Sequence, residues 1–327
     1  MERRRLAVPA IAAAVCVIMA LIMIFTVPKK AVPKVGICIA SRKDISSNNY
    51  AQILKDNLSS KGCIVNIADA GADQSVQLMQ IITLIDDGFD ILVIDPVMVS
   101  AAEEITILLK EADIPAVFIG QQPQDDVSSQ WERICYVGSD SSQLGYLQGQ
   151  LILDVLNQGD VNEDGLVSYI MLQDDPQKTH TLQRSEGVLQ ALKDANIPVT
   201  ALRTLCGNND QAESRMLCAK SLAELGKDIE VIFCNTDTMA LGAFEAIQDG
   251  GWMVGTDIYL VSIGGNQKVL EHIQQGRMTG TVMEDIPAQV QKTADVILRL
   301  FQGESVEQIY YVDYLKITQK NVMLHIE

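Results

Sequence analysis

The stretch Val231-Ile232-Phe233-Cys234-Asn235-Thr236-Asp237 passes from four apolar residues to three polar ones, and apolar residues at helical spacing follow over 238–249. A short run that is apolar at every position is typical of a strand buried on both faces of a parallel sheet, because helices cover both sides of such a sheet. The stretch therefore predicts a strand, a polar turn at its carboxyl end, and a returning helix.

The same order of strand, turn and helix recurs along the chain from residue 34 onward. A first set of predicted strands covers 35–39, 64–67, 91–94 and 117–119, with helices over 50–58, 76–85 and 101–109. A second set of strands covers 167–171, 199–202, 231–234 and 259–263, with helices over 181–195, 211–225 and 238–249. The sequence therefore predicts an α/β fold with two Rossmann-like lobes and a ligand in the crevice at the carboxyl ends of their parallel strands.

Polar residues gather where the predicted strands end. They are Ser41, Arg42, Lys43 and Asp44 after the first strand, Asp95 after the third, Gly120 and Gln121 after the fourth, and Thr236 and Asp237 after Cys234. Asp95 could act as a general base. Because it ends a strand and precedes a proline, it could also simply close a turn. The three histidines, His180, His272 and His325, have no nucleophile elbow, zinc-binding helix or phosphate loop beside them. We therefore expect a protein that is not an enzyme.

The N-terminus contains a long apolar segment. Residues 6–27 are uncharged, with three arginines before them and two lysines after them. About 20 apolar residues suffice to cross a bilayer, and the arginines favour a cytoplasmic N-terminus. No convincing small-x-small cleavage site follows, so an uncleaved anchor is preferred over a cleaved signal. The rest of the chain is then extracytoplasmic, at the cell surface or in the periplasm, and is either membrane-anchored or secreted.

The net charge and the cysteines further limit the functions that the protein could have. The formal net charge of the chain is −17. Because residues 1–33 contain five basic residues and one acidic residue, the remainder of the chain is more acidic than this value. Such an acidic surface argues against nucleic-acid binding, but it could equally serve only solubility. The seven cysteines form no disulfide framework. Cys38, Cys63, Cys135 and Cys234 are expected in the core, and Cys206 and Cys218 could pair.

A possible metal-binding loop lies at Asp160-Val161-Asn162-Glu163-Asp164-Gly165. It matches the first half of a calcium loop, in which side chains at alternate positions provide oxygen ligands and glycine permits the sharp turn. The ligands would be Asp160, Asn162, Asp164, the carbonyl of Leu166, and Ser168 directly or through water. Met171 stands where such a loop needs a bidentate glutamate, so the last carboxylate must come from elsewhere. An acidic turn without metal is the alternative reading.

These residues resemble those of the extracytoplasmic sugar-binding proteins of the type I periplasmic binding class, closest to the calcium-carrying galactose/glucose-binding proteins. The loop at 160–165 carries the resemblance together with Ile229-Glu230-Val231-Ile232-Phe233-Cys234-Asn235-Thr236-Asp237. The resemblance implies that Glu230 completes a calcium site. It also implies a three-segment hinge near 136–140, 280–285 and 311–314. The predicted parts are a signal or anchor at 1–33, an N-terminal lobe at 34–139 plus 286–312, and a C-terminal lobe at 140–285 plus 313–327.

The resemblance also implies a ligand-binding set, which this chain keeps only in part. Arg184 matches the sugar-binding arginine of the family, and Asp44 matches its first-strand aspartate. Four further positions are occupied by residues different from those usual in the family: Lys178, His180, Thr236 and Glu284. Gly120, Gly207 and Gly264 stand where an asparagine, a stacking tryptophan and an aspartate are usual. Tyr50 could be an aromatic wall or a core residue. Classical glucose or galactose specificity is therefore not expected.

The sequence as a whole predicts a monomeric solute-binding protein that captures a small sugar-like ligand between its lobes. Its expected partner is the permease of an ABC importer or a membrane receptor. The alternative is a membrane-anchored sensing module with a diverged pocket and no role in transport.

Overall fold

The computed structural model describes residues 32–123, 130–177 and 179–326, which form two compact units. The first unit comprises the described residues up to Phe118, with Pro123–Ile134 and Ala294–Val306. The second comprises Ile119–Gln122, Cys135–Thr293 and the chain from Glu307 onward. The predicted lobe boundaries at 139, 285 and 312 remain predictions.

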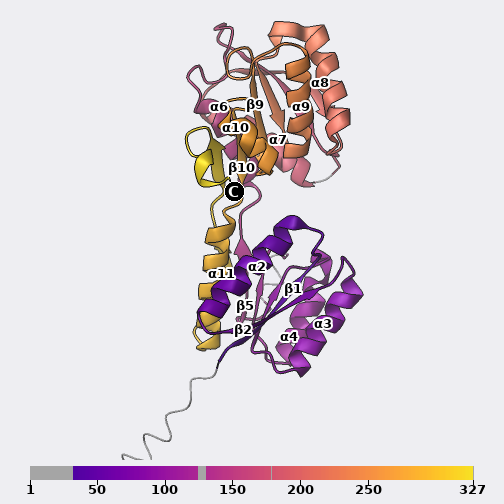
Figure 1. Cartoon of the computed structure of the whole chain (residues 1–327), viewed down its shortest axis with the longest axis vertical. Coiled ribbons are helices and arrows are strands. Elements are labelled where there is room, and N and C mark those ends of the chain that lie inside the picture. The colour runs from indigo at the N-terminus through magenta and orange to yellow at the C-terminus, as the bar shows by residue number, and fades with distance from the viewer. Residues whose placement is uncertain (1–31, 124–129, 178, 327) are drawn as a thin grey trace, which may run out of the picture. The chain divides into compact units, whose positions relative to one another are not determined.

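The first half of the chain alternates strands with helices. The elements are β1 (Lys34–Ile39), α2 (Ile45–Ser60), β2 (Ile64–Asp69), α3 (Gln74–Asp86), β3 (Ile91–Ile94), α4 (Ala102–Glu111), β4 (Ala116–Phe118) and β5 (Ile134–Gly138). With β11 (Ile309–Tyr311) the strands form a sheet of order β11-β5-β4-β3-β1-β2. All four residues of β3 are fully buried, because α3 and α4 lie on one side of this sheet and α2 on the other (Figure 1).

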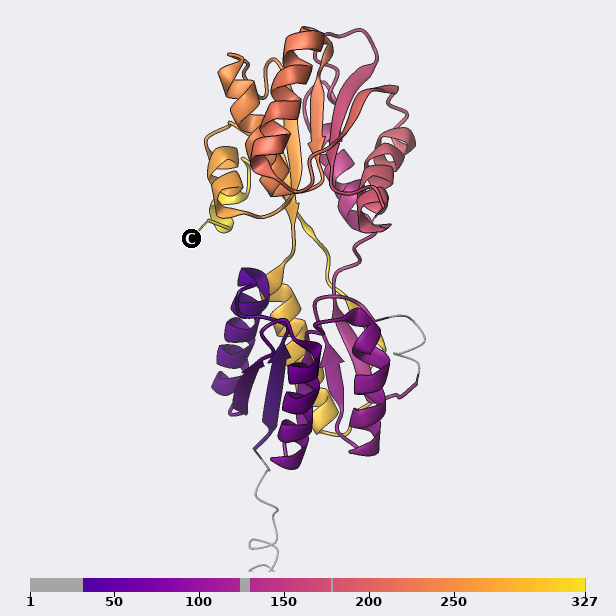
Figure 2. The same ribbon diagram turned by 90° about the vertical axis from the view of Figure 1, so that its right-hand side faces the viewer.

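The second half repeats the pattern. Its elements are α6 (Gln143–Leu153), β6 (Val167–Gln173), α7 (Thr179–Asp194), β7 (Val199–Cys206), α8 (Gln211–Leu225), β8 (Val231–Cys234), α9 (Asp237–Asp249), β9 (Tyr259–Gly264), α10 (Gln267–Gln274), β10 (Gly280–Met283), α11 (Ile286–Phe301) and β12 (Leu315–Thr318). The sheet order is β12-β10-β9-β8-β6-β7. In the turned view, α8 and α9 cover one face of this sheet and α6 and α7 the other (Figure 2).

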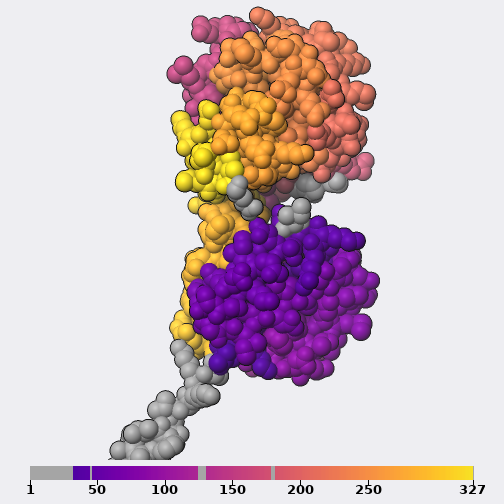
Figure 3. Space-filling model, viewed as in Figure 1, coloured from indigo at the N-terminus to yellow at the C-terminus, as the bar shows by residue number. Residues whose placement is uncertain are grey.

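The prediction of parallel sheets is confirmed, with one exception at an edge. In the second sheet β7, β6, β8, β9 and β10 run parallel to their neighbours. The edge strand β12 pairs antiparallel with β10, with Gly280 opposite Thr318. The C-terminal residues that follow β12 lie at the surface of the second unit (Figure 3), where the Gln319 amide donates to the carbonyl of Gln274 at 3.2 Å.

The structure bears on the cysteines and on Tyr50, for which the sequence made predictions or left alternatives open. Cys38, Cys63, Cys135 and Cys234 are buried as expected. Cys206 and Cys218 are both free thiols, so the suggested disulfide between them is not formed. Burial raises the pKa of the Cys218 thiol to about 12, which keeps it protonated and unreactive at neutral pH. Tyr50 is 5% exposed and belongs to the core.

In the part of the chain that the structure describes, no helix has the length and apolar character needed to cross a membrane. The predicted anchor at 6–27 lies outside the described residues.

Candidate functional site

Arg184 is positioned by close packing of α7 against α6. A Cβ atom on Gly145 of α6 would overlap the carbonyl oxygen of Arg184. A Cβ atom on Gly187 would come within 2.7 Å of the backbone nitrogen of Tyr146. Only glycine allows two helix backbones to approach this closely, so these two residues fix the distance between α6 and α7. They thereby fix the place of Arg184 relative to the ends of β6 and β8.

The Arg184 guanidinium is only partly satisfied by protein groups. Its Nη1 donates to the carbonyl of Asn235 at 2.8 Å, whereas its Nε is buried without a hydrogen-bond partner among the described residues. Burial lowers the pKa of Arg184, and the charges of Asp174 and Glu284 act in the opposite direction. Burial and the charge of Glu284 raise the pKa of the neighbouring Tyr314 phenol. The guanidinium thus lies near acidic groups, and its buried Nε has no partner among the described residues.

Asn235 and Thr181 add two more unpaired polar atoms beside Arg184. Asn235 is 1% exposed and directs its amide nitrogen to the Thr181 carbonyl at 3.3 Å and the Ser185 hydroxyl at 3.1 Å. Its Oδ1 has no partner in the described chain, and the same holds for the hydroxyl of Thr181. A buried polar atom without a partner loses the free energy of its hydrogen bond to water. Unpaired groups therefore gather at the carboxyl end of β8, as a site for a polar ligand requires.

The other predicted ligand residues of the second unit have different surroundings. Thr236 caps α9 by accepting from the Met239 N–H at 3.4 Å, and its hydroxyl donates to Asn209 at 2.7 Å. Glu284 is exposed just after β10 and acts electrostatically on Arg184. Lys178 lies outside the described residues, as does the side chain of His180. Of this group, Arg184 and Glu284 are brought together, and Thr236 has a role in helix capping.

In the first unit, Asp44 is exposed and acts as the N-cap of α2. Its Oδ1 accepts from the backbone N–H groups of Ser46 at 2.9 Å and Ser47 at 3.2 Å. Capping of the helix by itself accounts for an aspartate at this position, and no bound ligand is needed to explain it. Its second oxygen accepts no hydrogen bond from the described residues.

Asp95 is a stronger candidate that the predicted binding set omitted. It follows β3 directly and is half-buried, and its Oδ2 accepts from the Ser47 hydroxyl at 2.5 Å and weakly from the Ala40 N–H at 3.5 Å. Burial raises the pKa of this carboxyl, the hydrogen bond from Ser47 lowers it, and the negative charge of Asp44 raises it further. In the sequence, Asp95 is an acidic residue directly after a fully apolar strand. That pattern is also typical of a turn, so it did not identify a binding residue.

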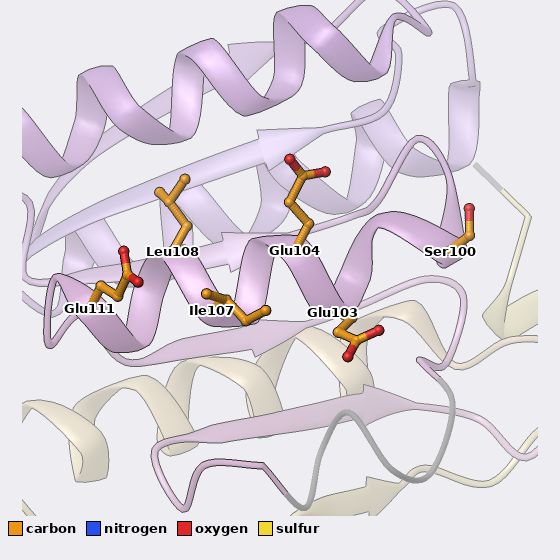
Figure 4. A pocket seen from close by; sticks show the side chains of 6 residues that line it. All are labelled: Ser100, Glu103, Glu104, Ile107, Leu108 and Glu111. Carbon is orange, nitrogen blue, oxygen red and sulfur yellow. The ribbon is translucent and has the colours of Figure 1, made fainter.

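Two hollows on the surface are lined by none of these residues. One follows the outer face of α4 and is lined by Ser100, Glu103, Glu104, Ile107, Leu108 and Glu111 (Figure 4). Another lies between α8 and α9. Neither includes a residue that the sequence assigned to ligand binding, and both are open hollows on helix surfaces. The arrangement at the strand ends is therefore the better candidate for a binding site.

The predicted calcium loop folds back on itself. Asp160 accepts from the N–H groups of Asp164 at 3.1 Å and Gly165 at 2.9 Å. Asn162 accepts from Asp164 at 2.9 Å, and Asp164 accepts from Leu166 at 2.9 Å. Gly165 has a φ of 85°, a left-handed backbone that glycine adopts without steric cost. These bonds form an acidic turn and hold the three side chains in one loop.

Glu230 is held against this loop. Its Oε1 accepts from the N–H groups of Val161 at 2.7 Å and Asn162 at 3.0 Å, and its Oε2 accepts from Ser168 at 2.7 Å. The carboxylate is 0% exposed, and no lysine or arginine in the described ranges pairs with it. A buried carboxylate without a counter-charge is costly, and its remaining lone pairs suit a cation. The donor set is all oxygen, which fits calcium.

The side chains of the loop and Glu230 do not form a metal-binding group among the described residues. Across 32–123, 130–177 and 179–326, no three histidine, cysteine, aspartate or glutamate side chains converge as metal ligands would. Glu230 nevertheless contacts the loop through the N–H groups of Val161 and Asn162. The calcium ion itself stays a prediction.

Comparison with known proteins assigns the family. The sequence model of the periplasmic binding protein domain matches residues 40–305, which is most of the chain. The chain belongs to this family. Because the family binds solutes and is not enzymatic, the prediction that the protein is not an enzyme is confirmed, as is the resemblance to type I periplasmic sugar-binding proteins.

Individual relatives agree with this assignment. The chain is 27% identical to the D-galactose/methyl-galactoside binding periplasmic protein of Haemophilus influenzae, over 83% of this chain and 82% of the relative. It is 25% identical to the ribose import binding protein of Escherichia coli, over 84% and 86% of the two chains. A solved periplasmic ribose ABC transporter protein from Conexibacter woesei has the same fold, with a TM-score of 0.75, 19% identity, and coverage of 90% and 94%.

Proposed function

We propose that this protein captures a small sugar or polyol outside the cytoplasm and delivers it to an ABC importer. Membership of the solute-binding family supports this role, as do relatives named for galactose binding and ribose import. The observation that carries the proposal is the set of unpaired buried polar atoms on Arg184, Asn235 and Thr181 at the carboxyl end of β8. A hydroxyl-rich ligand both donates and accepts hydrogen bonds, so it can satisfy all three.

A thermal-shift screen tests this proposal. The panel contains hexoses, pentoses, furanoses and cyclic polyols, each added to the purified full chain at millimolar concentration. A ligand that binds only the folded protein raises its stability by about 2.7 kcal/mol when it is present at a hundredfold excess over Kd. We expect one narrow chemical group to raise the melting temperature. A panel without any stabilising compound would contradict the proposal.

We further propose that Ca²⁺ binds the loop 160–166 together with Ser168 and Glu230. The buried Glu230 carboxylate without a positive partner supports this, because a divalent cation would neutralise it. Chelation by EGTA should then lower the melting temperature of the wild type, and Glu230→Gln should abolish that difference. Glu271→Gln, an exposed position on α10, is the matched control and should respond to EGTA like the wild type. Equal melting curves of the wild type with and without EGTA would rule the site out.

We also propose that the apolar segment at 6–27 anchors the protein to the membrane. Its spanning length and the arginines before it support an uncleaved anchor with an extracytoplasmic C-terminal part. Mass spectrometry of the native N-terminus distinguishes the two forms. The anchored form begins at the initiator region, and a mature chain beginning near residue 31 would show that the segment is a cleaved signal.

A further inference from the structure

Helix α3 of the first unit has an apolar face that is exposed. Val76, Met79 and Ile82 are 39%, 68% and 44% exposed, and their spacing of three residues places them on one side of the helix. None of the other α-helices within the described residues has more than one exposed large apolar side chain. The only charged residue of α3 is its last one, Asp86. An exposed apolar face of this kind is typical of an interaction surface.

The neighbouring helix α4 shows the usual pattern. It lies on the same side of the first sheet as α3 (Figure 1), but its outer face is charged. Ile107 is its one exposed large apolar residue and lies among Glu103, Glu104 and Glu111 (Figure 4). Charged residues normally occupy the outer face of a helix that is surrounded by water. The outer face of α3 therefore suits an apolar or interfacial partner better than it suits water.

The place where the chain enters the first unit indicates which partner this is. Lys34, the first residue of β1, lies beside the end of α3, because its N–H donates to Asp90 at 2.8 Å and its Nζ to the carbonyl of Asp87 at 3.3 Å. Residues 28–33 separate Lys34 from the apolar run at 6–27, and six residues span at most about 20 Å. With that run in a bilayer, the end of α3 lies within reach of the membrane surface.

The length of α3 keeps its whole outer face close to the same surface. The helix has 13 residues and is therefore about 20 Å long. A helix with one apolar face lies along the membrane interface and buries that face at the boundary of headgroups and acyl chains. A second copy of the chain could also cover an apolar face. The linker at 28–33, however, holds every anchored copy next to the bilayer, whereas it brings no second copy close.

We propose, building on the anchor proposed above, that the outer face of α3 rests on the lipid surface, with Val76, Met79 and Ile82 among the headgroups. The anchor keeps the first unit near the membrane, and α3 determines which side of this unit faces it. Asp86 at the end of the helix provides no attraction to anionic lipids. The contact therefore depends on burial of apolar side chains, which salt does not screen.

Fluorescence of the full chain in phosphatidylcholine vesicles tests the inference. Met79→Trp places a reporter in the apolar face, and Met216→Trp on α8 is the matched control, because Met216 is 64% exposed. Lipids brominated near the top of the acyl chain quench a tryptophan that reaches them. After subtraction of the wild-type signal, we expect at least about threefold more quenching at position 79 than at position 216. Raising the ionic strength should leave the quenching at position 79 unchanged.

Oxidation of methionine in the wild-type chain tests the same contact without a substitution. Met79 and Met216 have similar exposed fractions, so hydrogen peroxide should convert both to the sulfoxide at similar rates where neither is covered. In vesicles with a large excess of lipid over protein, we expect Met79 to be oxidised at least about threefold more slowly than Met216. Mass spectrometry of the two peptides measures both rates in one sample.

Flotation of the vesicles separates the inference from the anchor on which it rests. Chains that float with the vesicles but show equal quenching at positions 79 and 216 would overturn the inference and leave the anchor intact. Slow oxidation of Met79 without quenching by brominated lipid would also overturn it, because a protein surface then covers the face. Chains that do not float with the vesicles would contradict the anchor and the inference together.

Discussion

Asp237 is a residue whose role in this fold is structural. Its carboxylate is buried and accepts from the hydroxyls of Ser262 and Thr281 and from the N–H groups of Gly265 and Asn266, both at 2.6 Å. These bonds tie the start of α9 to β9, to β10 and to the loop after β9. A Cβ atom on Gly264 would lie 2.7 Å from the Asp237 carboxyl carbon. The local packing therefore leaves no room for a side chain at 264.

Removal of this carboxylate should destabilise the protein strongly. Asp237→Ala leaves two backbone N–H groups and two hydroxyls without partners, and each buried unsatisfied group costs about 1–3 kcal/mol. We expect a loss of at least about 3 kcal/mol in the free energy of unfolding, measured by urea denaturation. Asp249→Ala, at the exposed end of α9, is a control whose loss should stay below about 1 kcal/mol. Similar losses in the two variants would contradict this role.

The same residue should make stability depend on pH. Burial raises the pKa of Asp237 in the folded state, despite the hydrogen bonds that lower it. The folded protein therefore binds this proton more tightly than the unfolded chain does. Its contribution to stability is present below the ordinary pKa of an aspartate and is lost as pH rises through the higher folded value. Asp237→Asn should remove this decline, seen as a flatter dependence of the urea midpoint on pH above 4. Parallel curves for the wild type and the variant would disprove the assignment.

At the scale of elements, the sequence predicted most strands and helices because hydrophobic periodicity marks them directly. The apolar runs at 91–94 and 231–234 coincide with β3 and β8. Helix α6 was not predicted, since Gly145 and Gly149 lower its intrinsic helix propensity and their packing role appears only in the tertiary structure. Strand β12 was missed because four residues at a sheet edge carry little periodic signal. Asp95 was noticed at a strand end, but its burial could not be read from the sequence.

The packing of α6 against α7 gives a prediction at this scale. In Gly145→Ala the new methyl group overlaps the Arg184 carbonyl, so the helices must separate and Arg184 must shift. We expect a loss of about 1–3 kcal/mol in stability, as in other overpacked sites, together with weaker ligand binding. Thermal melting and calorimetry of the purified variant measure both effects. Glu186→Ala changes an exposed position of α7 and should leave both unchanged. Wild-type binding by Gly145→Ala would show that this contact does not position the arginine.

At the scale of the whole molecule, the two α/β units could be predicted because one pattern of strand and helix occurs twice along the chain. The ligand could not be predicted in the same way. Its recognition depends on single side chains at strand ends, and no periodic pattern in the sequence marks them. In the second unit the structure retains Arg184 as a partly unsatisfied donor and adds Asn235 beside it. These residues make solute binding the central claim for the whole protein.

Isothermal titration of the full chain with the best compound from the ligand panel tests that claim most directly. The account predicts one binding site per chain. In Arg184→Ala, loss of the charge-assisted contacts should weaken the affinity by at least about tenfold, while the chain remains folded by circular dichroism. Arg203→Ala removes an arginine of β7 whose side chain is 25% exposed and pairs with Glu224, and it should bind like the wild type. No saturable binding of any sugar or polyol of the panel, or equal affinity in the wild type and Arg184→Ala, would contradict the account.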